Sequence, residues 1–442
     1  MEELVSSLKL LRCELEKDYY SEDYLDKFES ELPEKISVSA VIPSFNRAPY
    51  NPDEDEINLN PLYWCLTSLL NQKPKLNEII VIDDNSNDFT NKLVLKFKRL
   101  QKSEDVKIIL IKNRKRVGSS ISRNKGVKKA SSDFIFFMDD DCIAKKYSVF
   151  GAYHTFVKLS ENQLKVGAIH LPYYNRINFP FKITRIDNIG RINLEKGTWK
   201  GNYDFFPKKY LKNNGNYFID DVYKILKPIQ VQNLNGCFLT SKKRFMMAKG
   251  FPDFFSWKNS AGEEIELACR YMENGYSLFF TPDPKFGLYH GMFGESNKIF
   301  VNRNDLLKHK DDILIENLSL EKINKECSKP RENTGNRVNI EEWYHSKIIS
   351  FFIIFYTRNV NGALNWVKDV KRLFVEENVR NFGISKWMNI EDKEKREEIW
   401  YNAIIEGLEL STKKTKDEIW DFLKELEKIR KFEIPPSLHF FD

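Results

Sequence analysis

The chain lacks the segments and clusters that mark several common classes of protein. Its longest apolar stretch, Ile348–Tyr356, is too short to span a bilayer and is expected to form one buried helix. The first residues have neither the basic nor the apolar region of a signal peptide. The six cysteines stand singly, without a Cys-x-x-Cys pair, so neither a zinc site nor a disulfide framework is indicated. We therefore expect reduced thiols and a cytoplasmic protein that associates with the inner face of a membrane peripherally, if at all.

A large excess of charge of one sign is also missing. The 442 residues include 70 basic and 64 acidic ones, interspersed along the chain, for a formal net charge of +6. This excess is too small and too scattered to indicate nucleic-acid binding. Hydrophobic residues make up 41% and charged residues 30%, the balance of a globular protein, and the length allows two or three domains.

Two glycine-rich phosphate-binding motifs are absent as well. No Gly-x-Gly-x-x-Gly follows the first predicted strand, which argues against a dinucleotide site, and no Gly-x-x-x-x-Gly-Lys-Ser/Thr occurs, which excludes a P-loop. The turn after that strand instead reads Pro43-Ser-Phe-Asn-Arg47. Phe45 offers a flat surface for a nucleobase and Arg47 is a candidate phosphate donor. An ordinary strand exit is the alternative.

Strand and helix patterns alternate from residue 38 onward. Strands are expected at 38–42, 78–82, 106–111 and 134–138, with helices at 62–71, 90–102 and 119–130. This alternation predicts an α/β fold with a Rossmann-like, mostly parallel sheet, whose ligands lie beyond the carboxyl ends of the strands. Further helices are expected over residues 1–32 and, in a helical C-terminal extension, at 341–359, 362–377, 393–408 and 414–431.

The apolar run over residues 134–138 leads directly into three aspartates, Asp139, Asp140 and Asp141. Because side chains alternate along an extended chain, Asp139 and Asp141 are expected to point one way and Asp140 the other. Two carboxylates that point together repel each other, and a hard divalent cation such as Mg²⁺ or Mn²⁺ removes that conflict. A solvated acidic turn is the alternative interpretation of the triplet alone.

Two other segments supply candidates at the same edge of the predicted sheet. Asp83 and Asp84 end the second strand, where a carboxylate can bind a base or ribose, or cap the next helix. Arg123 lies in a run with a helix N-terminus near Gly118, a position that favours anions. Taken alone, Arg123 is more typical of a surface residue.

The second half of the chain adds two carboxylates and a histidine. Glu263 and Glu264 open a predicted helix, where the dipole favours acidic side chains even without a function. His290 follows a short strand. A lone histidine there is usually structural, but its place downstream of a carboxylate cluster favours metal binding.

Six short motifs follow one another in order: Val41-Ile-Pro-Ser-Phe-Asn-Arg47, Ile80-Val-Ile-Asp-Asp-Asn-Ser86, Arg123-Asn-Lys-Gly126, Phe137-Met-Asp-Asp-Asp141, Gly262-Glu-Glu-Ile-Glu-Leu267 and Tyr289-His290. In this order they resemble family 2 glycosyltransferases. The resemblance covers residues 36 to about 295. It implies the A-type glycosyltransferase fold, a nucleotide-diphosphate sugar donor and a Mn²⁺ or Mg²⁺ ion.

The resemblance also implies a role for each candidate residue. Phe45 and Asp84 would contact the nucleobase with Asp83 beside them, and the donor nucleotide would further contact Pro43, Arg47, Arg123 and Asp140. Asp139 and Asp141 form an Asp-x-Asp motif that holds ribose and metal, and His290 completes the metal site. Glu264 stands where the family usually has the aspartate of a Glu-Asp pair, the catalytic base. Glu263 remains its rival.

The implied reaction is an inverting, metal-dependent transfer of a sugar, with UDP as the expected nucleotide. The acceptor is a hydroxyl on a bacterial surface glycan, a lipid-linked glycan, or a peptide or protein. We expect an N-terminal helical segment (1–35), a catalytic domain (36–300) with a nucleotide-sugar half (36–150) and an acceptor half (151–300), and a helical region (301–442). Packing against the catalytic domain is the default expectation for that last region, and three roles are open to it: shaping the acceptor site, forming a homo-oligomer, or docking on a membrane or a partner enzyme.

Two other functions compete with this one. A sugar-nucleotide nucleotidyltransferase also binds nucleotides on an α/β sheet, but usually brings a glycine-rich phosphate loop after its first strand. A glycan- or nucleotide-binding protein that kept the fold and lost activity is the non-enzymatic alternative.

Overall fold

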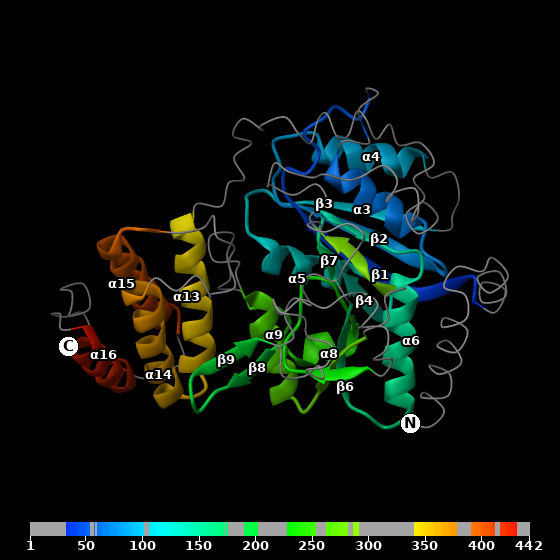
Figure 1. Cartoon of the computed structure of the whole chain (residues 1–442). Coiled ribbons are helices and arrows are strands. Elements are labelled where there is room, and N and C mark those ends of the chain that lie inside the picture. The colour runs from blue at the N-terminus through cyan, green and yellow to red at the C-terminus, as the bar shows by residue number, and fades with distance from the viewer. Residues whose placement is uncertain are drawn as a thin grey trace. The chain divides into compact units, whose positions relative to one another are not determined.

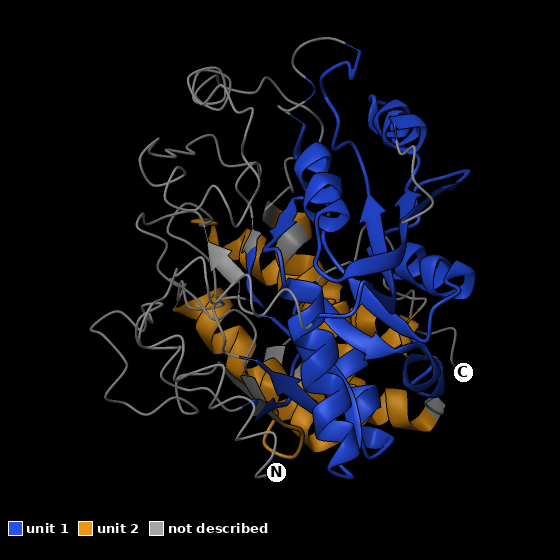
Figure 2. Cartoon of the chain, turned by 90° about the vertical axis from the view of Figure 1, so that its right-hand side faces the viewer, with its two compact units in different colours: residues 1–189, 201–251, 267–337 blue, residues 190–200, 252–266, 338–442 orange. Residues whose placement is uncertain are grey.

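The computed structural model describes residues 32–53, 57, 60–100, 106–171, 173–175, 190–201, 228–252, 262–281, 286–290, 340–377, 390–411 and 416–430. The helix expected over residues 1–32 lies outside the described residues, except for its last residue. The chain divides into two compact units, which Figure 2 colours separately. Unit 1 comprises residues 1–189, 201–251 and 267–337, and unit 2 comprises residues 190–200, 252–266 and 338–442.

An eight-stranded sheet forms the centre of unit 1 (Figure 1). Its strands lie in the order β10 (Ile229–Val231), β12 (Ser277–Phe280), β6 (Val166–His170), β11 (Phe238–Ser241), β4 (Phe134–Phe137), β1 (Lys35–Ser44), β2 (Lys75–Asp83) and β3 (Lys107–Lys112). From β4 to β3 the neighbours are parallel, whereas β11 is antiparallel to both of its neighbours. The predicted α/β class with a mostly parallel sheet is therefore confirmed.

The three helices predicted at 62–71, 90–102 and 119–130 are observed close to those positions, as α3 (Pro61–Leu70), α4 (Thr90–Leu100) and α5 (Ser119–Lys129). Unit 1 also contains α6 (Ser148–Glu161), which was not predicted, α8 (Lys242–Met247) and all of α9 (Glu263–Glu273) except its first turn, which belongs to unit 2. A second sheet of three strands has the order β5 (Cys142–Ala144), β13 (Leu288–His290) and β7 (Tyr173–Asn175).

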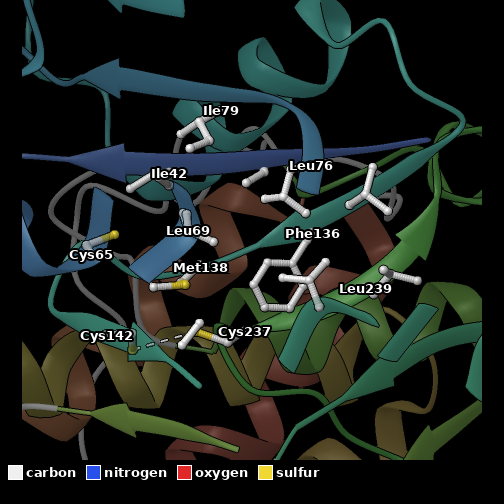
Figure 3. Packing of buried hydrophobic residues seen from close by; sticks show 14 of the residues in the cluster. Ile42, Cys65, Leu69, Leu76, Ile79, Phe136, Met138, Cys142, Cys237 and Leu239 are labelled. Atoms are coloured by element: carbon white, nitrogen blue, oxygen red, sulfur yellow. Dashed lines mark hydrogen bonds between the residues drawn. The ribbon is translucent and has the colours of Figure 1, made fainter. Parts of the chain in front are cut away.

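Strand β4 is buried on both faces, which explains its uninterrupted apolar sequence. Phe136 packs in the cluster that Figure 3 shows, among side chains of β1, β2 and α3. Phe137 packs on the rings of Phe238, Phe245 and Phe251. The strand has no polar face and runs through the middle of the core. The aspartates that follow it therefore lie at one edge of the sheet.

Helix α5 approaches the sheet closely at a glycine. A Cβ atom added to Gly126 would lie 2.4 Å from Cγ1 of Val41 and 2.8 Å from Cδ1 of Ile82. Only a residue without a side chain fits between the helix and strands β1 and β2. Arg123 lies one turn earlier on the same helical face, so this packing carries it to the edge of the sheet.

Unit 2 is mainly helical. It contains α13 (Ile340–Tyr356), α14 (Val360–Val370), the π-helical segment η4 (Lys371–Glu376), α15 (Lys393–Leu410), α16 (Lys416–Arg430) and a hairpin of β8 (Gly190–Asn193) and β9 (Thr198–Gly201). The single helix expected over residues 362–377 is instead α14 continued by η4. The apolar stretch Ile348–Tyr356 lies in α13 and is buried, as predicted. Within the described part of the chain, no helix combines the length and apolarity that crossing a membrane requires.

His170 provides a test of this fold. Its imidazole is fully buried at the end of β6, with its centre 5.0 Å from that of the Phe280 ring. Neither ring nitrogen has a hydrogen-bond partner among the described residues. Burial lowers the pKa of His170 to about 3, because the charged ring would lose its hydration.

We expect His170→Leu to increase the free energy of unfolding, and to do so more as the pH falls below 6.5. The unfolded wild-type chain gains a proton there that the folded chain excludes, which costs up to ~1.4 kcal/mol of stability per pH unit. Urea denaturation of both proteins at pH 7.5 and pH 5 measures the difference. A difference that does not change with pH would contradict the buried, neutral histidine.

Candidate active site

Three loops follow β1, β2 and β4 at the carboxyl edge of the parallel strands and are joined by hydrogen bonds. The N–H of Asn46 donates to Oγ of Ser86 at 2.9 Å, which links the first loop to the second. The N–H of Phe45 donates to Oδ2 of Asp140 at 3.3 Å, which links the first loop to the third. The predicted convergence of these three segments is confirmed. Asn46 has a left-handed backbone (φ 53°), a conformation that asparagine tolerates better than most residues.

Asp83 and Asp84 hold these loops in place. Asp83 accepts a hydrogen bond from the N–H of Ser86 at 2.9 Å. Asp84 accepts from the N–H groups of Val117 and Gly118, at 2.9 and 2.8 Å, at the start of α5. Both carboxylates are buried, and both serve to shape the edge. Their predicted contacts with a base or ribose stay predictions.

The aspartate triplet is paired with two arginines. Arg47 reaches Asp140 with Nε at 2.9 Å and Asp141 with Nη2 at 3.4 Å. Arg123 reaches Oδ1 of Asp139 with Nη2 at 2.6 Å. We expected Asp139 and Asp141 to point together, opposite Asp140. This expectation is wrong, because Asp140 and Asp141 share Arg47 whereas Asp139 pairs with Arg123. The strand ends at Phe137 and the triplet is part of a turn, closed by the N–H of Cys142 on the carbonyl of Asp139 at 3.1 Å, so strict alternation stops.

Arg123 is buried, with 3% of its side chain exposed, so the surface alternative for it is wrong. Its charge is compensated by Asp139, and its guanidinium carbon lies 5.3 Å from the centre of the Phe251 ring. Arg47, predicted to bind phosphate, is instead paired with carboxylates in this structure. Both guanidinium groups thus lie directly beside the carboxylates of the triplet.

Asp140 differs electrostatically from an ordinary aspartate. Burial raises its pKa to about 6, although the Arg47 guanidinium opposes that shift. A carboxyl group with this pKa takes up a proton in mildly acidic solution, where an ordinary aspartate is still ionised.

Sequence analysis missed the partner of Phe45. The guanidinium carbon of Arg116 lies 3.8 Å from the centre of the Phe45 ring, a cation–π contact on one face. Phe45 therefore presents at most one face to a nucleobase. The only signal in the sequence was the basic run around Arg116, which does not identify the aromatic partner.

Gly236 is a second residue that sequence analysis missed. A Cβ atom at this position would lie 2.3 Å from Oδ2 of Asp139. The next residue, Cys237, accepts a hydrogen bond at Sγ from the N–H of Asp139 at 3.4 Å. The segment before β11 therefore packs directly on the first aspartate of the triplet, which a pattern of alternating residues cannot reveal.

The donor atoms around the triplet fit a divalent cation. Asp139 and Asp141 offer carboxylate oxygens, which suit Mg²⁺ and Mn²⁺. In the second sheet the backbone of His290 is paired with that of Cys142, the residue that follows Asp141. The structure does not describe the side chain of His290. Ligand atoms of Asp139, Cys142 and Cys237 also lie within 4.8 Å of one another, a softer set that suits zinc.

Glu263 and Glu264 begin α9 and belong to unit 2. Glu263 is buried and Glu264 is half-buried. The structure brings the predicted donor residues together within unit 1, and the catalytic role of either glutamate stays a prediction.

Comparison with known proteins agrees with this geometry. Residues 39–163, from β1 to the end of α6, match the model of glycosyl transferase family 2. The chain contains a family 2 glycosyltransferase domain. All three loops and the aspartate triplet fall inside the matched segment.

Two curated relatives are similar over parts of their length. A GalNAc(5)-diNAcBac-PP-undecaprenol beta-1,3-glucosyltransferase of Campylobacter jejuni is 37% identical over 105 residues, 24% of this chain and 29% of that protein. The poly(ribitol-phosphate) beta-N-acetylglucosaminyltransferase TarP of Staphylococcus aureus is 28% identical over 134 residues, 29% of this chain and 36% of that protein. The chain thus spans about a third of the length of these relatives.

Among solved structures, GalNAc-T7 with UDP, GalNAc and Mn²⁺ aligns at 18% identity and a TM-score of 0.40, covering 59% of this chain and 44% of that one.

We expect Gly236→Ala to weaken nucleotide binding in the presence of Mn²⁺ by about tenfold or more, because the new methyl group displaces the carboxylate of Asp139. Calorimetry with UDP measures the loss. Gly275→Ala is the control: an added Cβ there meets nothing within 4 Å, so any effect of its left-handed backbone (φ 74°) acts away from Asp139. Equal UDP affinity in Gly236→Ala and wild type would show that Asp139 does not act in nucleotide binding.

Proposed function

We propose that this protein is a metal-dependent, inverting glycosyltransferase that moves a sugar from a nucleotide-diphosphate donor, UDP-linked, to an acceptor hydroxyl. The observation that carries the proposal is the convergence of three loops of a family 2 domain on the Asp139–Asp141 turn. Arginines paired with that turn add the positive charge that a diphosphate needs.

Donor binding would exchange the partners of these charges. Asp139, Asp141 and His290 would hold a divalent cation, which stabilises the negative charge that develops on the departing nucleoside diphosphate. Arg47 and Arg123 would then leave the carboxylates and donate to phosphate oxygens. Phe45, with Arg116 on one face, would stack on the nucleobase through the other. Asp83 and Asp84 would keep the loops around it in register.

The acceptor must lose a proton as it attacks the anomeric carbon. Glu264 is proposed as the general base, since a carboxylate within hydrogen-bond reach of the hydroxyl can accept that proton. A single displacement on the face opposite the leaving group inverts the anomeric centre, and no covalent sugar–enzyme intermediate forms.

The acceptor class is suggested by the relatives. The C. jejuni enzyme is named for an undecaprenol-linked glycan and the S. aureus enzyme for poly(ribitol-phosphate). We propose an acceptor of this kind, a hydroxyl on a lipid-linked glycan or a surface polymer. A lipid-linked acceptor would require peripheral contact with the inner face of the membrane.

We expect the full-length protein to hydrolyse or transfer from at least one nucleotide sugar, with UDP-sugars first in a screen that also includes GDP- and TDP-sugars. EDTA should stop the reaction and added Mn²⁺ should restore it, because the aspartates alone repel the diphosphate. Release of free nucleotide measures the rate. Asp141→Ala should abolish the metal-dependent part of UDP binding in calorimetry.

Two outcomes would count against this function. Unchanged UDP affinity of Asp141→Ala with Mn²⁺ would remove the metal site from the proposal. Binding of nucleotide sugars without any turnover, across donors and metals, would favour the non-enzymatic alternative.

We expect Glu264→Gln to leave donor binding intact and to lower turnover by about 100-fold or more, because the amide cannot accept the acceptor's proton. Glu263→Gln is the matched variant one residue away. Turnover and UDP affinity are measured for both. Near-full turnover in Glu264→Gln together with loss of turnover in Glu263→Gln would identify Glu263 as the general base instead.

A further inference from the structure

The first turn of α9, which carries both candidate bases, is joined to the end of α13 by a buried ion pair within unit 2. Arg358 donates to Glu266 through Nη1 to Oε2 at 2.7 Å and through Nη2 to Oε1 at 3.2 Å. The two side chains are only 10% and 7% exposed. An arginine that binds both oxygens of a carboxylate fixes its orientation as well as its distance. The pair therefore fixes the start of α9 against α13.

The guanidinium group of Arg358 is itself held at the end of α13. Its Nη1 also donates to the carbonyl of Ile354 at 3.3 Å, and its backbone N–H donates to the carbonyl of Phe355 at 3.1 Å. A cation is favoured at the last carbonyls of a helix. The donor side of the ion pair is thus fixed independently of Glu266.

A second contact joins the two helices one turn before Glu266. Gly262 has a left-handed backbone (φ 105°), and a Cβ atom there would lie 3.2 Å from Cβ of Ser350 on α13. The carbonyl of Gly262 accepts the N–H groups that begin the helix, from Ile265 and Glu266. Residues 263 and 264 therefore lie between two residues that both contact α13.

We propose that Arg358 is a positioning residue for the catalytic carboxylate: acting through Glu266, it fixes the first turn of α9 and with it the side chain of Glu264. This inference rests on the proposed function. Glu264 and Glu266 share one helical turn, so a rotation or tilt of that turn moves both. Misplacement of a catalytic group by about 1 Å can lower turnover about 100-fold. The helical unit would then contribute directly to turnover.

The experiment compares variants of the full-length protein in metal-dependent donor hydrolysis, with the nucleotide sugar that wild type turns over. Arg358→Met should lower kcat about 10- to 100-fold while the KM for the donor and the calorimetric affinity for UDP stay unchanged. Arg358→Lys should recover part of kcat, because it keeps the charge but not the two-bonded geometry.

Two further variants separate positioning from folding. Arg358→Met alone takes the bidentate partner from the buried carboxylate of Glu266, so the double variant Arg358→Met/Glu266→Leu removes both charges and is expected to fold. It should show the same loss of kcat. Arg396→Met is the matched control. Arg396 is a buried arginine of the same unit that donates to the carbonyls of Val375 and Ile390, and its loss should lower the unfolding midpoint without changing kcat.

A double-mutant cycle gives the most direct test. If Arg358 acts through the base, Arg358→Met should cause no further loss in a Glu264→Gln background, since the group that it positions is already gone. Wild-type kcat in the folded double variant, or a full additional loss in the Glu264→Gln background, would overturn the inference. Absence of turnover in wild type would reject the proposed function instead, and the two failures are therefore distinct.

Discussion

The structure of the site depends on one electrostatic constraint, the placement of three consecutive carboxylates at the end of a strand that is buried on both faces. Asp139, Asp140 and Asp141 leave the core together, and their mutual repulsion has to be compensated at the edge of the sheet. Arg123 compensates it from α5 and Arg47 from the loop after β1. The loop after β1, the triplet and the start of α5 are thereby held as one arrangement.

Close packing at glycines converts that constraint into a defined geometry. Gly126 allows α5 to approach strands β1 and β2, which sets the depth of Arg123. Gly236 allows the segment before β11 to lie against the carboxylate of Asp139. A methyl group at Gly236 would clash with the carboxylate of Asp139 itself, whereas one at Gly126 would clash with Val41 and Ile82 and displace the helix that carries Arg123. The positions of the site's charges are therefore set by packing as much as by hydrogen bonds.

Much of this arrangement could be predicted from the sequence. The remaining features could not, for physical reasons. The alternation of apolar runs with helical patterns predicted the parallel part of the sheet, and topology then brought three loops to one edge. The turn at Asp139–Asp141 was not predicted, because the point where a strand ends depends on its partners. The burial of Arg123 depends on a counter-charge sixteen residues away, and the contact of Arg116 with Phe45 depends on the fold of two loops. Single-residue tendencies contain neither kind of information.

The charge balance of the cluster explains why donor and cation should bind together. Three carboxylates face two guanidinium groups. Such a cluster has no excess of positive charge with which to attract a diphosphate. In the proposed function, a divalent cation on the carboxylates would supply that excess and would also free the arginines to donate to phosphate oxygens. Each ligand would then increase the affinity for the other by the same factor, as linkage requires, so the charge balance of the cluster predicts that donor binding depends on the metal.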